Sequence, residues 1–242
     1  MRLVQTELKL VMREPVVLTF VFAFPVITVL VLGNVFDADD TAFEGVVPAQ
    51  WYVAAYIGVV IAAIGLIMLP VHIAGYRHQG VTRRFRVSLF PHWALPLAHV
   101  IIGMVVAVLG IAVLLIAGGV AYGLPAIEDV PTTIAGLLLG TLAIISVGVA
   151  LGSALPNARS AQGLGLMLFL PFFLLSGGGP PPEAMGDGMQ TISNWIPLTH
   201  VIRAVQEPWL DIGDPGNHFV VVIGILVAAT AAWLWLAFRT ES

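Results

Sequence analysis

The chain has 242 residues, of which 59% are hydrophobic and 10% are charged, and its mean hydropathy is +0.98. Soluble domains carry roughly 25% charged residues, so this composition excludes an ordinary soluble fold. The formal charge of −4 does not identify a partner, and the lack of cysteine excludes disulfides, thiolate metal ligands and thiol nucleophiles.

Residues 1–14 form a polar segment that we expect to be an amphipathic helix lying on the membrane surface. At about 100° per residue, most of its polar side chains share one arc and its apolar side chains share the opposite arc. The alternative is a cytoplasmic extension of the first span. The segment is too long and too polar for the start of a cleavable signal peptide, so we expect none.

Six stretches of the chain are apolar enough to cross a bilayer, which takes about 20 residues in a helix. Backbone groups in lipid must be paired internally, and period-two alternation is missing, so we expect helices rather than a barrel. The predicted fold is an all-α integral membrane protein with one transmembrane domain over residues 1–242. Its predicted spans are residues 16–36, 52–75, 95–122, 133–155, 160–176 and 218–238.

Glycine and proline residues within the spans predict features of helix packing. Small residues four positions apart let two helices approach closely, and prolines kink or interrupt a helix. The glycine pairs are Gly119 with Gly123, Gly136 with Gly140, and Gly148 with Gly152, and the prolines are Pro25, Pro70 and Pro171.

The loop of residues 76–94 combines an arginine-rich stretch with a glycine and a proline-containing turn. A loop that only fixed the topology would explain the arginines but not the glycine and the turn. We therefore predict a short surface helix that docks a soluble partner. Its candidate coupling residues are Gly80, Arg83, Arg84, Phe85 and Arg86.

The segment of residues 177–216 is the longest polar stretch between two spans. Three glycines and three prolines end the fifth helix abruptly, and an apolar stretch from Trp195 to Val205 is too short to span. This pattern predicts a re-entrant or interfacial helix in the outer leaflet. Arg203 and Glu207 stand four apart and are expected to pair on its surface.

The charged residues predict the orientation of the spans. Nine of the ten Lys and Arg residues fall on one side of the predicted topology, and Arg203 is the exception. Eleven of the fourteen acidic residues fall on the other side. By the positive-inside rule the basic side, with both termini, is cytoplasmic.

The predicted spans contain no Asp, Glu, Lys or Arg, and we considered only His72 and His99 as ionisable groups at membrane depth. The chain has no phosphate-binding loop and no histidine motif typical of a metal site. Active transport would therefore need an energy source on another chain. A membrane-embedded hydrolase, with Ser176 as nucleophile and His200 downstream, is an alternative that lacks the usual glycine before the serine.

The arrangement resembles the permease subunits of ABC type-2 exporters. The resemblance covers essentially the whole chain: an amphipathic start, six spans, the loop between spans two and three, and the segment after span five. Family members often carry a Glu-x-x-Gly-Thr pattern in the loop, where this chain has His78 to Thr82 with Gly80. In the outer segment the matching residues are Leu175 to Gly177, Pro180 to Pro182, Met185 and Trp195 to Thr199, with Arg203. The candidate outer-gate residues are Ser176, Gly177, Gly178, Gly179, Pro197, Arg203 and Glu207.

The resemblance implies a plasma-membrane permease, homodimeric or heterodimeric, that works with a separate ABC ATPase. ATP and magnesium would bind to that ATPase, and this chain would hold no cofactor, metal or nucleic acid and catalyse no reaction. Its expected neighbours are membrane lipids, and its cargo a lipophilic, drug-like, lipid or glycan-type molecule. An alternative within transport is an accessory permease for self-protection or copper-enzyme maturation.

Overall fold

The computed structural model describes residues 15, 18–36, 43–78, 94–181 and 184–239. Within these residues the structure is helical and contains no strand, which confirms the predicted fold class. In chain order the elements are η1 (Leu18–Ala23), α3 (Phe24–Leu32), α4 (Pro48–Ala62), η3 (Ala63–Met68), α5 (Leu69–His78), α7 (Ala94–Tyr122), α8 (Val130–Ala154), α9 (Ala158–Leu175), α10 (Asp187–Ser193), α11 (Pro197–Leu210) and α12 (Gly216–Arg239).

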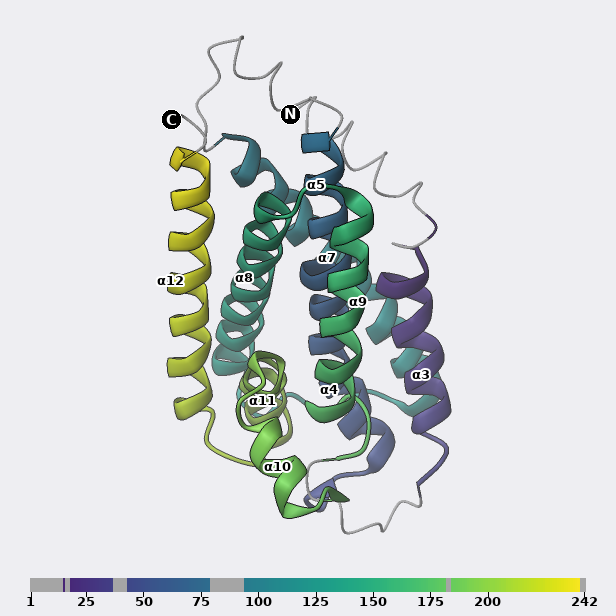
Figure 1. The fold of residues 1–242 in the computed structure, drawn as a ribbon. Helices are drawn as coiled ribbons and strands as arrows, with labels where there is room; N and C mark the ends of the chain where they lie inside the picture. Colours follow the sequence, from purple (N-terminus) through teal and green to yellow (C-terminus); the bar gives the residue numbers. More distant parts are fainter. Residues whose placement is uncertain (1–14, 16–17, 37–42, 79–93, 182–183, 240–242) are drawn as a thin grey trace.

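The long helices lie side by side in an elongated bundle, and the short helices α10 and α11 gather at one end of it (Figure 1). Five helices are long and apolar enough to cross a membrane, and a shorter apolar helix, Thr19–Leu32, corresponds to the first predicted span. The five are Pro48–Tyr76, Pro96–Tyr122, Val130–Ala154, Ala158–Leu175 and Gly216–Phe238. Two predicted elements, the surface helix of residues 1–14 and the coupling residues from Gly80 to Arg86, lie outside the described residues.

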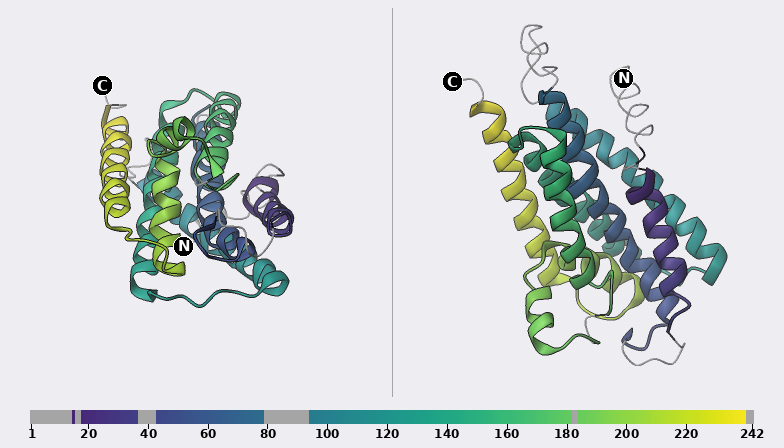
Figure 2. Two further views of the ribbon diagram at one scale, coloured as in Figure 1. Left: turned by 90° about the horizontal axis from the view of Figure 1, so that it is seen from below. Right: turned by 45° about the vertical axis from the view of Figure 1, so that its right-hand side comes forward.

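Helices α4, η3 and α5 form one continuous helix in the centre of the bundle. Its side chains are buried almost throughout, and α3, α7, α8, α9 and α11 pack around it (Figure 2). In contrast, α12 packs mainly against α8 and leaves much of its apolar surface exposed. The π-helical segment η3 ends just before Pro70, which cannot donate a backbone hydrogen bond.

Glycines on α8 let this helix approach the backbone of its neighbours. A Cβ atom added to Gly148 would lie against the carbonyl oxygen of Gly65 in η3, and one added to Gly136 would lie against the carbonyl oxygen of Ala204 in α11. Gly140 and Gly152 likewise face Val201 and Ile73. The packing role predicted for the α8 pairs is therefore confirmed.

Gly119 and Gly123 do not bring α7 against another helix within the described residues. The atoms nearest to a Cβ on Gly119 belong to Leu124, just beyond α7, and a Cβ on Gly123 would meet nothing within 4 Å. Gly123 instead has a φ of 75° where α7 ends, a left-handed conformation that glycine adopts readily.

Local capping residues define the ends of several helices. The carboxylate of Asp129 accepts a 3.1 Å hydrogen bond from the backbone N–H of Thr132 at the start of α8. The side chain of Asn157 accepts one of 2.9 Å from the N–H of Ser160 at the start of α9. These side chains satisfy backbone donors that the first turn leaves unpaired.

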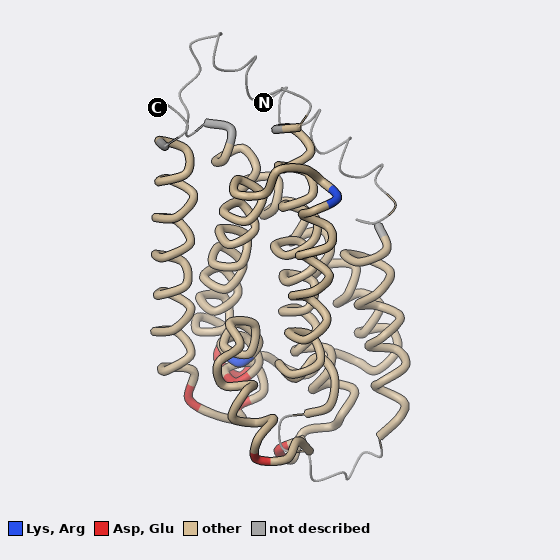
Figure 3. Tube along the Cα trace, in the orientation of Figure 1, with Lys and Arg blue, Asp and Glu red and all other residues tan. Residues whose placement is uncertain are grey.

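The described acidic residues gather at the end of the bundle that holds α10 and α11 (Figure 3). Arg203 is part of α11, whereas Arg159 lies at the start of α9, away from the end that leads to α10. This distribution is the one expected for a bundle whose ends face water, and it agrees with the charge asymmetry of the sequence.

We predict that Gly148→Ala lowers the free energy of unfolding by about 1–3 kcal/mol, because the new methyl group would press against the Gly65 carbonyl. The matched control is Gly163→Ala in α9, where a Cβ meets nothing within 4 Å. That control should be neutral, or stabilising by up to about 1 kcal/mol through helix propensity. Thermal unfolding in detergent measures both, and equal stability of the two variants would contradict the prediction.

We also predict that the α10 end of the bundle faces the cell exterior. Because the chain lacks cysteine, Gln190→Cys in α10 and Ser160→Cys in α9 can each be labelled singly. An impermeant thiol reagent added to intact cells should label position 190 and reach position 160 only after permeabilisation. Labelling of both positions in intact cells would contradict this orientation.

Candidate functional site

The glycine segment, residues 176–179, turns the chain away from the end of α9. The N–H of Ser176 donates to the Phe172 carbonyl at 3.0 Å, and Gly177 then adopts a φ of 92°. A Cβ on Gly178 would lie 2.9 Å from the Phe173 carbonyl oxygen, and one on Gly179 would lie 2.9 Å from the Leu174 carbonyl oxygen. Glycine is required here both by the backbone conformation and by the space available.

Two tyrosines of α4 hold the glycine segment against the central helix. The hydroxyl of Tyr56 donates a 2.8 Å hydrogen bond to the carbonyl of Gly178, and that of Tyr52 donates a 3.0 Å bond to the carbonyl of Gly179. Both tyrosine side chains are fully buried. The segment is therefore attached to the buried core.

Helix α11 has 14 residues, too few to span a membrane, yet most of it is buried. It crosses the end of the bundle and packs against α4, α8 and α12 (Figure 2). Pro197 occupies its first turn, where a missing N–H costs no hydrogen bond. This placement agrees with the predicted re-entrant helix, except that Trp195 precedes α11 and is 84% exposed.

Polar contacts anchor α11 on both sides. The amide of Gln206, which is fully buried, donates to the carbonyl of Trp51 in α4 at 3.1 Å. The indole N–H of Trp209 donates to the carbonyl of Pro125, and the N–H of Asp129 donates to the carbonyl of Pro208. The short helix is thus tied to the central helix and to the connection between α7 and α8.

Arg203 and Glu207 do not form the predicted pair. One guanidinium nitrogen of Arg203 lies 3.0 and 3.2 Å from the two carboxylate oxygens of Glu44, which is 159 residues away in the sequence. The carboxylate of Glu207 is buried and lies 3.3 Å from His218 Nε2 instead. The two side chains leave α11 toward different neighbours, although their spacing permits a contact.

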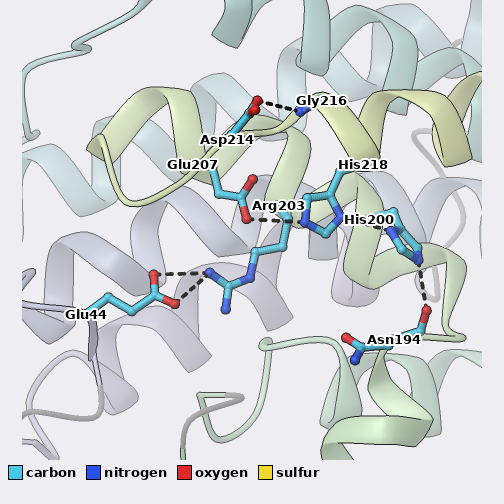
Figure 4. A network of polar contacts seen from close by, with 8 residues as sticks. All are labelled: Glu44, Asn194, His200, Arg203, Glu207, Asp214, Gly216 and His218. Atoms are coloured by element: carbon cyan, nitrogen blue, oxygen red, sulfur yellow. Dashed lines mark hydrogen bonds and ion pairs between the residues drawn. The ribbon is translucent and has the colours of Figure 1, made fainter.

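A chain of polar contacts continues from Glu207 across two histidine rings (Figure 4). His218 Nδ1 lies 2.9 Å from His200 Nδ1, and His200 Nε2 lies 3.0 Å from the carbonyl oxygen of Asn194. Burial lowers the pKa of His200, with a smaller contribution from the charge of His218, whereas the Asn194 carbonyl and Glu207 act in the opposite direction. The chain joins α11 to α12 and to the turn that follows α10.

Residues 1–208 match the family described as ABC-2 type transporter. The chain belongs to the ABC-2 type transporter family. That family is one of transporters, and the apolar helices in the described part of the chain fit a multi-pass membrane protein. The match includes α11, with Arg203 and Glu207, and ends before α12.

Two named relatives of this ABC-2 chain are transport permeases. It is 31% identical to the inner membrane transport permease YhhJ of Escherichia coli over 125 residues, which are 50% of this chain and 31% of YhhJ. The matched part is thus about a third of the length of YhhJ. It is 26% identical over 218 residues to the putative transport permease YvfS of Bacillus subtilis, covering 85% of this chain and 86% of YvfS.

The hydrolase alternative for this ABC-2 permease gains no support from the site. Both ring nitrogens of His200 are engaged, one by His218 and the other by Asn194. The hydroxyl oxygen of Ser176 is buried and makes no hydrogen bond with the described residues. No group of three metal-ligating side chains occurs among the described residues either.

Sequence reasoning identified the glycine segment, Pro197, Arg203 and Glu207, but it missed the side chains that hold them. Tyr52 and Tyr56 lie inside a predicted span, where they looked like ordinary buried aromatics. His218 stands at the start of the last predicted span, so the spans contain an ionisable residue besides His72 and His99. A search for polar residues at span ends would have found His218 and Glu44, though not their partners.

We predict that Tyr56→Phe loosens the glycine segment, because it leaves the buried Gly178 carbonyl without its tyrosine donor. Stability should fall by about 1 kcal/mol, and amide hydrogen exchange of residues 176–179 should become faster.

The matched control is Tyr122→Phe, which removes a hydroxyl that donates 2.7 Å to the Leu30 carbonyl and does not touch the glycine segment. It should lower stability comparably without changing exchange at residues 176–179. Unchanged exchange there in Tyr56→Phe would show that the tyrosines do not hold the segment.

Proposed function

We propose that this chain is the membrane subunit of an ATP-driven exporter that moves a lipophilic, drug-like, lipid or glycan-type molecule out of the cell. The ATPase is a separate chain that binds ATP and magnesium. Two permeases, identical or different, form the pathway in the plasma membrane, with both termini on the cytoplasmic side.

The observation that carries the proposal is the charge distribution of a bundle that belongs to a transport family. The spans in the described part of the chain contain no acidic residue and no lysine, and Arg159 is present only at the very start of α9. Ion-driven carriers place ionisable groups at membrane depth. Apart from Arg159, the only side chains in the described spans that can carry a charge near neutral pH are histidines, His72, His99 and His218, and these lie near span ends. A permease of this kind takes its energy from a partner, as the family implies in general.

The exposed surface of the bundle supports a membrane assembly. Large apolar side chains on α7 and α12, including Ile116, Val120, Val220 and Val227, are between 63% and 85% exposed. Such surfaces are stable against lipid tails or against a second permease. Both surroundings are part of the proposed assembly.

In the proposed exporter, the glycine segment and α11 form the outer gate, with Ser176, Gly177, Gly178, Gly179, Pro197, Arg203 and Glu207 as its residues. The segment is fixed by two tyrosine hydroxyls, and α11 is fixed by Gln206 and Arg203. Each link is a small number of hydrogen bonds, which a rearrangement of the bundle can exchange. Release of these links would open the end of the bundle to the exterior.

The test of the assignment is co-purification with a nucleotide-binding chain. Each candidate ATPase is expressed with this chain, and the retained one is reconstituted into vesicles with it. ATP turnover should depend on the pair and rise with an exported compound from a lipophilic panel. Retention and turnover without transport of any cargo would favour an accessory permease, and no retained ATPase would contradict the proposal.

We predict that Arg84→Ala combined with Phe85→Ala weakens ATPase binding by roughly thirty-fold. Loss of an anchoring side chain costs about 2 kcal/mol or more, and arginine can pair bidentately with a partner carboxylate. The basic residues that remain, Arg77, Arg83 and Arg86, still favour correct insertion.

The control is Arg159→Ala, which removes a basic side chain at the start of α9, outside this loop. ATPase pull-down and coupled ATP turnover are measured for both variants. Wild-type values in the double variant would exclude these residues of the loop as the coupling element while leaving the ATPase assignment to the co-purification experiment.

A further inference from the structure

The contacts between Asn194, His200, His218 and Glu207 can be analysed by counting protons. Three contacts link these four residues in a row, and each contact needs one hydrogen between its two heavy atoms. The Asn194 carbonyl accepts only, so His200 Nε2 must carry a hydrogen. An ionised Glu207 also accepts only, so His218 Nε2 must carry one as well.

The middle contact, between the two Nδ1 atoms 2.9 Å apart, needs a third hydrogen. Two neutral imidazoles carry only two hydrogens on nitrogen, and two imidazoliums carry four. When Glu207 is ionised, the three contacts are therefore complete only if the two rings together carry three hydrogens on nitrogen. That state is one imidazolium and one neutral imidazole. Placing the third hydrogen on Glu207 instead of His218 gives the same total for the three groups.

We propose that His200, His218 and Glu207 form a binding site for one proton, and that this proton closes the contact between α11 and α12. The inference rests on the geometry of the three side chains and does not depend on the exporter assignment. It adds a pH-sensitive latch at the same end of the bundle as the glycine segment.

His218 is the ring that faces a carboxylate. This ring lies against the buried carboxylate of Glu207, whose second oxygen has no hydrogen-bond partner in the described structure. Burial lowers the pKa of His200, which favours the neutral form of that ring. His218 Nε2 lies 3.3 Å from the Glu207 carboxylate, so a hydrogen on that nitrogen points at an acceptor.

The other charged groups described at this end of the bundle are either paired with a neighbour or exposed. Glu44, which precedes α4, pairs with Arg203 of α11. Asp129, at the start of α8, is bonded to Thr132, and Asp214, before α12, accepts from the N–H of Gly216. Asp187 lies in α10, Glu128 in the connection between α7 and α8, and Asp211 directly after α11, and all three are exposed.

The contact between α11 and α12 should weaken both above and below an intermediate pH range. At higher pH the site loses its third hydrogen, and an imidazole lone pair then faces the Glu207 carboxylate. At lower pH a fourth hydrogen places two N–H groups and two positive charges against each other. The folded-state pKa of His200 lies below its ordinary value of 6.5. The contribution of His200 to the stability of the fold is therefore fully present above pH 6.5 and is lost as the pH falls toward the folded-state pKa.

The test is a pH titration of the full-length chain in nanodiscs, followed by ¹⁵N NMR of selectively labelled histidine. His218→Gln and His200→Gln assign the two rings among the six histidines. We expect a plateau with His218 as imidazolium and His200 as the neutral Nε2–H tautomer, bounded by two separate steps that belong to the pair. Two independent single steps, without that mixed state, would overturn the proposal.

Glu207→Gln should narrow the pH range over which the two rings share three hydrogens, because it removes the carboxylate that faces His218 Nε2. The matched control is Glu128→Gln, which changes an exposed carboxylate at the same end and should leave both histidines unchanged. An unchanged His218 titration in Glu207→Gln would exclude the shared site. If that variant does not fold, the two-step titration of the wild-type chain still decides the question.

Spin labels at Gln190→Cys and Asn217→Cys measure whether the proton holds α10 and α11 to α12. Their distance distribution should be narrow on the plateau and broaden on both the acidic and the alkaline side. A reference pair at Ser160 and Phe238, at the other end of the bundle, should not change. A distribution at positions 190 and 217 that does not vary with pH would overturn the latch.

Discussion

The close approach of α8 to the central helix is the constraint on which the bundle depends. In lipid, apolar side chains gain little by leaving the solvent, so helices associate through van der Waals contact and hydrogen bonds. Gly148 meets the Gly65 carbonyl and Gly136 meets the Ala204 carbonyl, so α8 packs closely against both the central helix and α11. With this contact formed, α12 packs against α8, and α11 packs against α8 and α4 at the end of the bundle.

The two ends of the bundle differ in how they are built. At the end that holds α10 and α11, tyrosine hydroxyls, a buried glutamine and an arginine–glutamate pair tie short segments to the long helices. These links join residues 122 to 159 positions apart. They are few and polar, whereas the middle of the bundle is held by continuous apolar packing. A change of conformation is therefore easier at this end than in the centre.

The proton-binding site and the glycine segment lie at the same end and share α11 as a neighbour. Helix α9, which leads into the glycine segment, contacts both α10 and α11. A gain or loss of a proton that shifts α11 relative to α12 would also alter the surroundings of residues 176–179. In the proposed exporter, both ATP hydrolysis by the partner and the pH at the acidic end would then influence the conformation of the bundle. The proton site adds to the proposed transport function and does not replace it.

The sequence alone determined the class of the protein, the positions of its apolar helices and the separation of charge between its ends. These properties depend on composition and local order, because a stretch of about 20 apolar residues is stable only as a helix in lipid. The glycine segment was also predictable, since three consecutive glycines interrupt any helix. Tertiary structure alone decided which polar side chains meet near this segment. Arg203 pairs with Glu44 and not with Glu207, and Glu207 lies against His218. Such partners are brought together by helices distant in sequence, and the spacing along one helix does not reveal them.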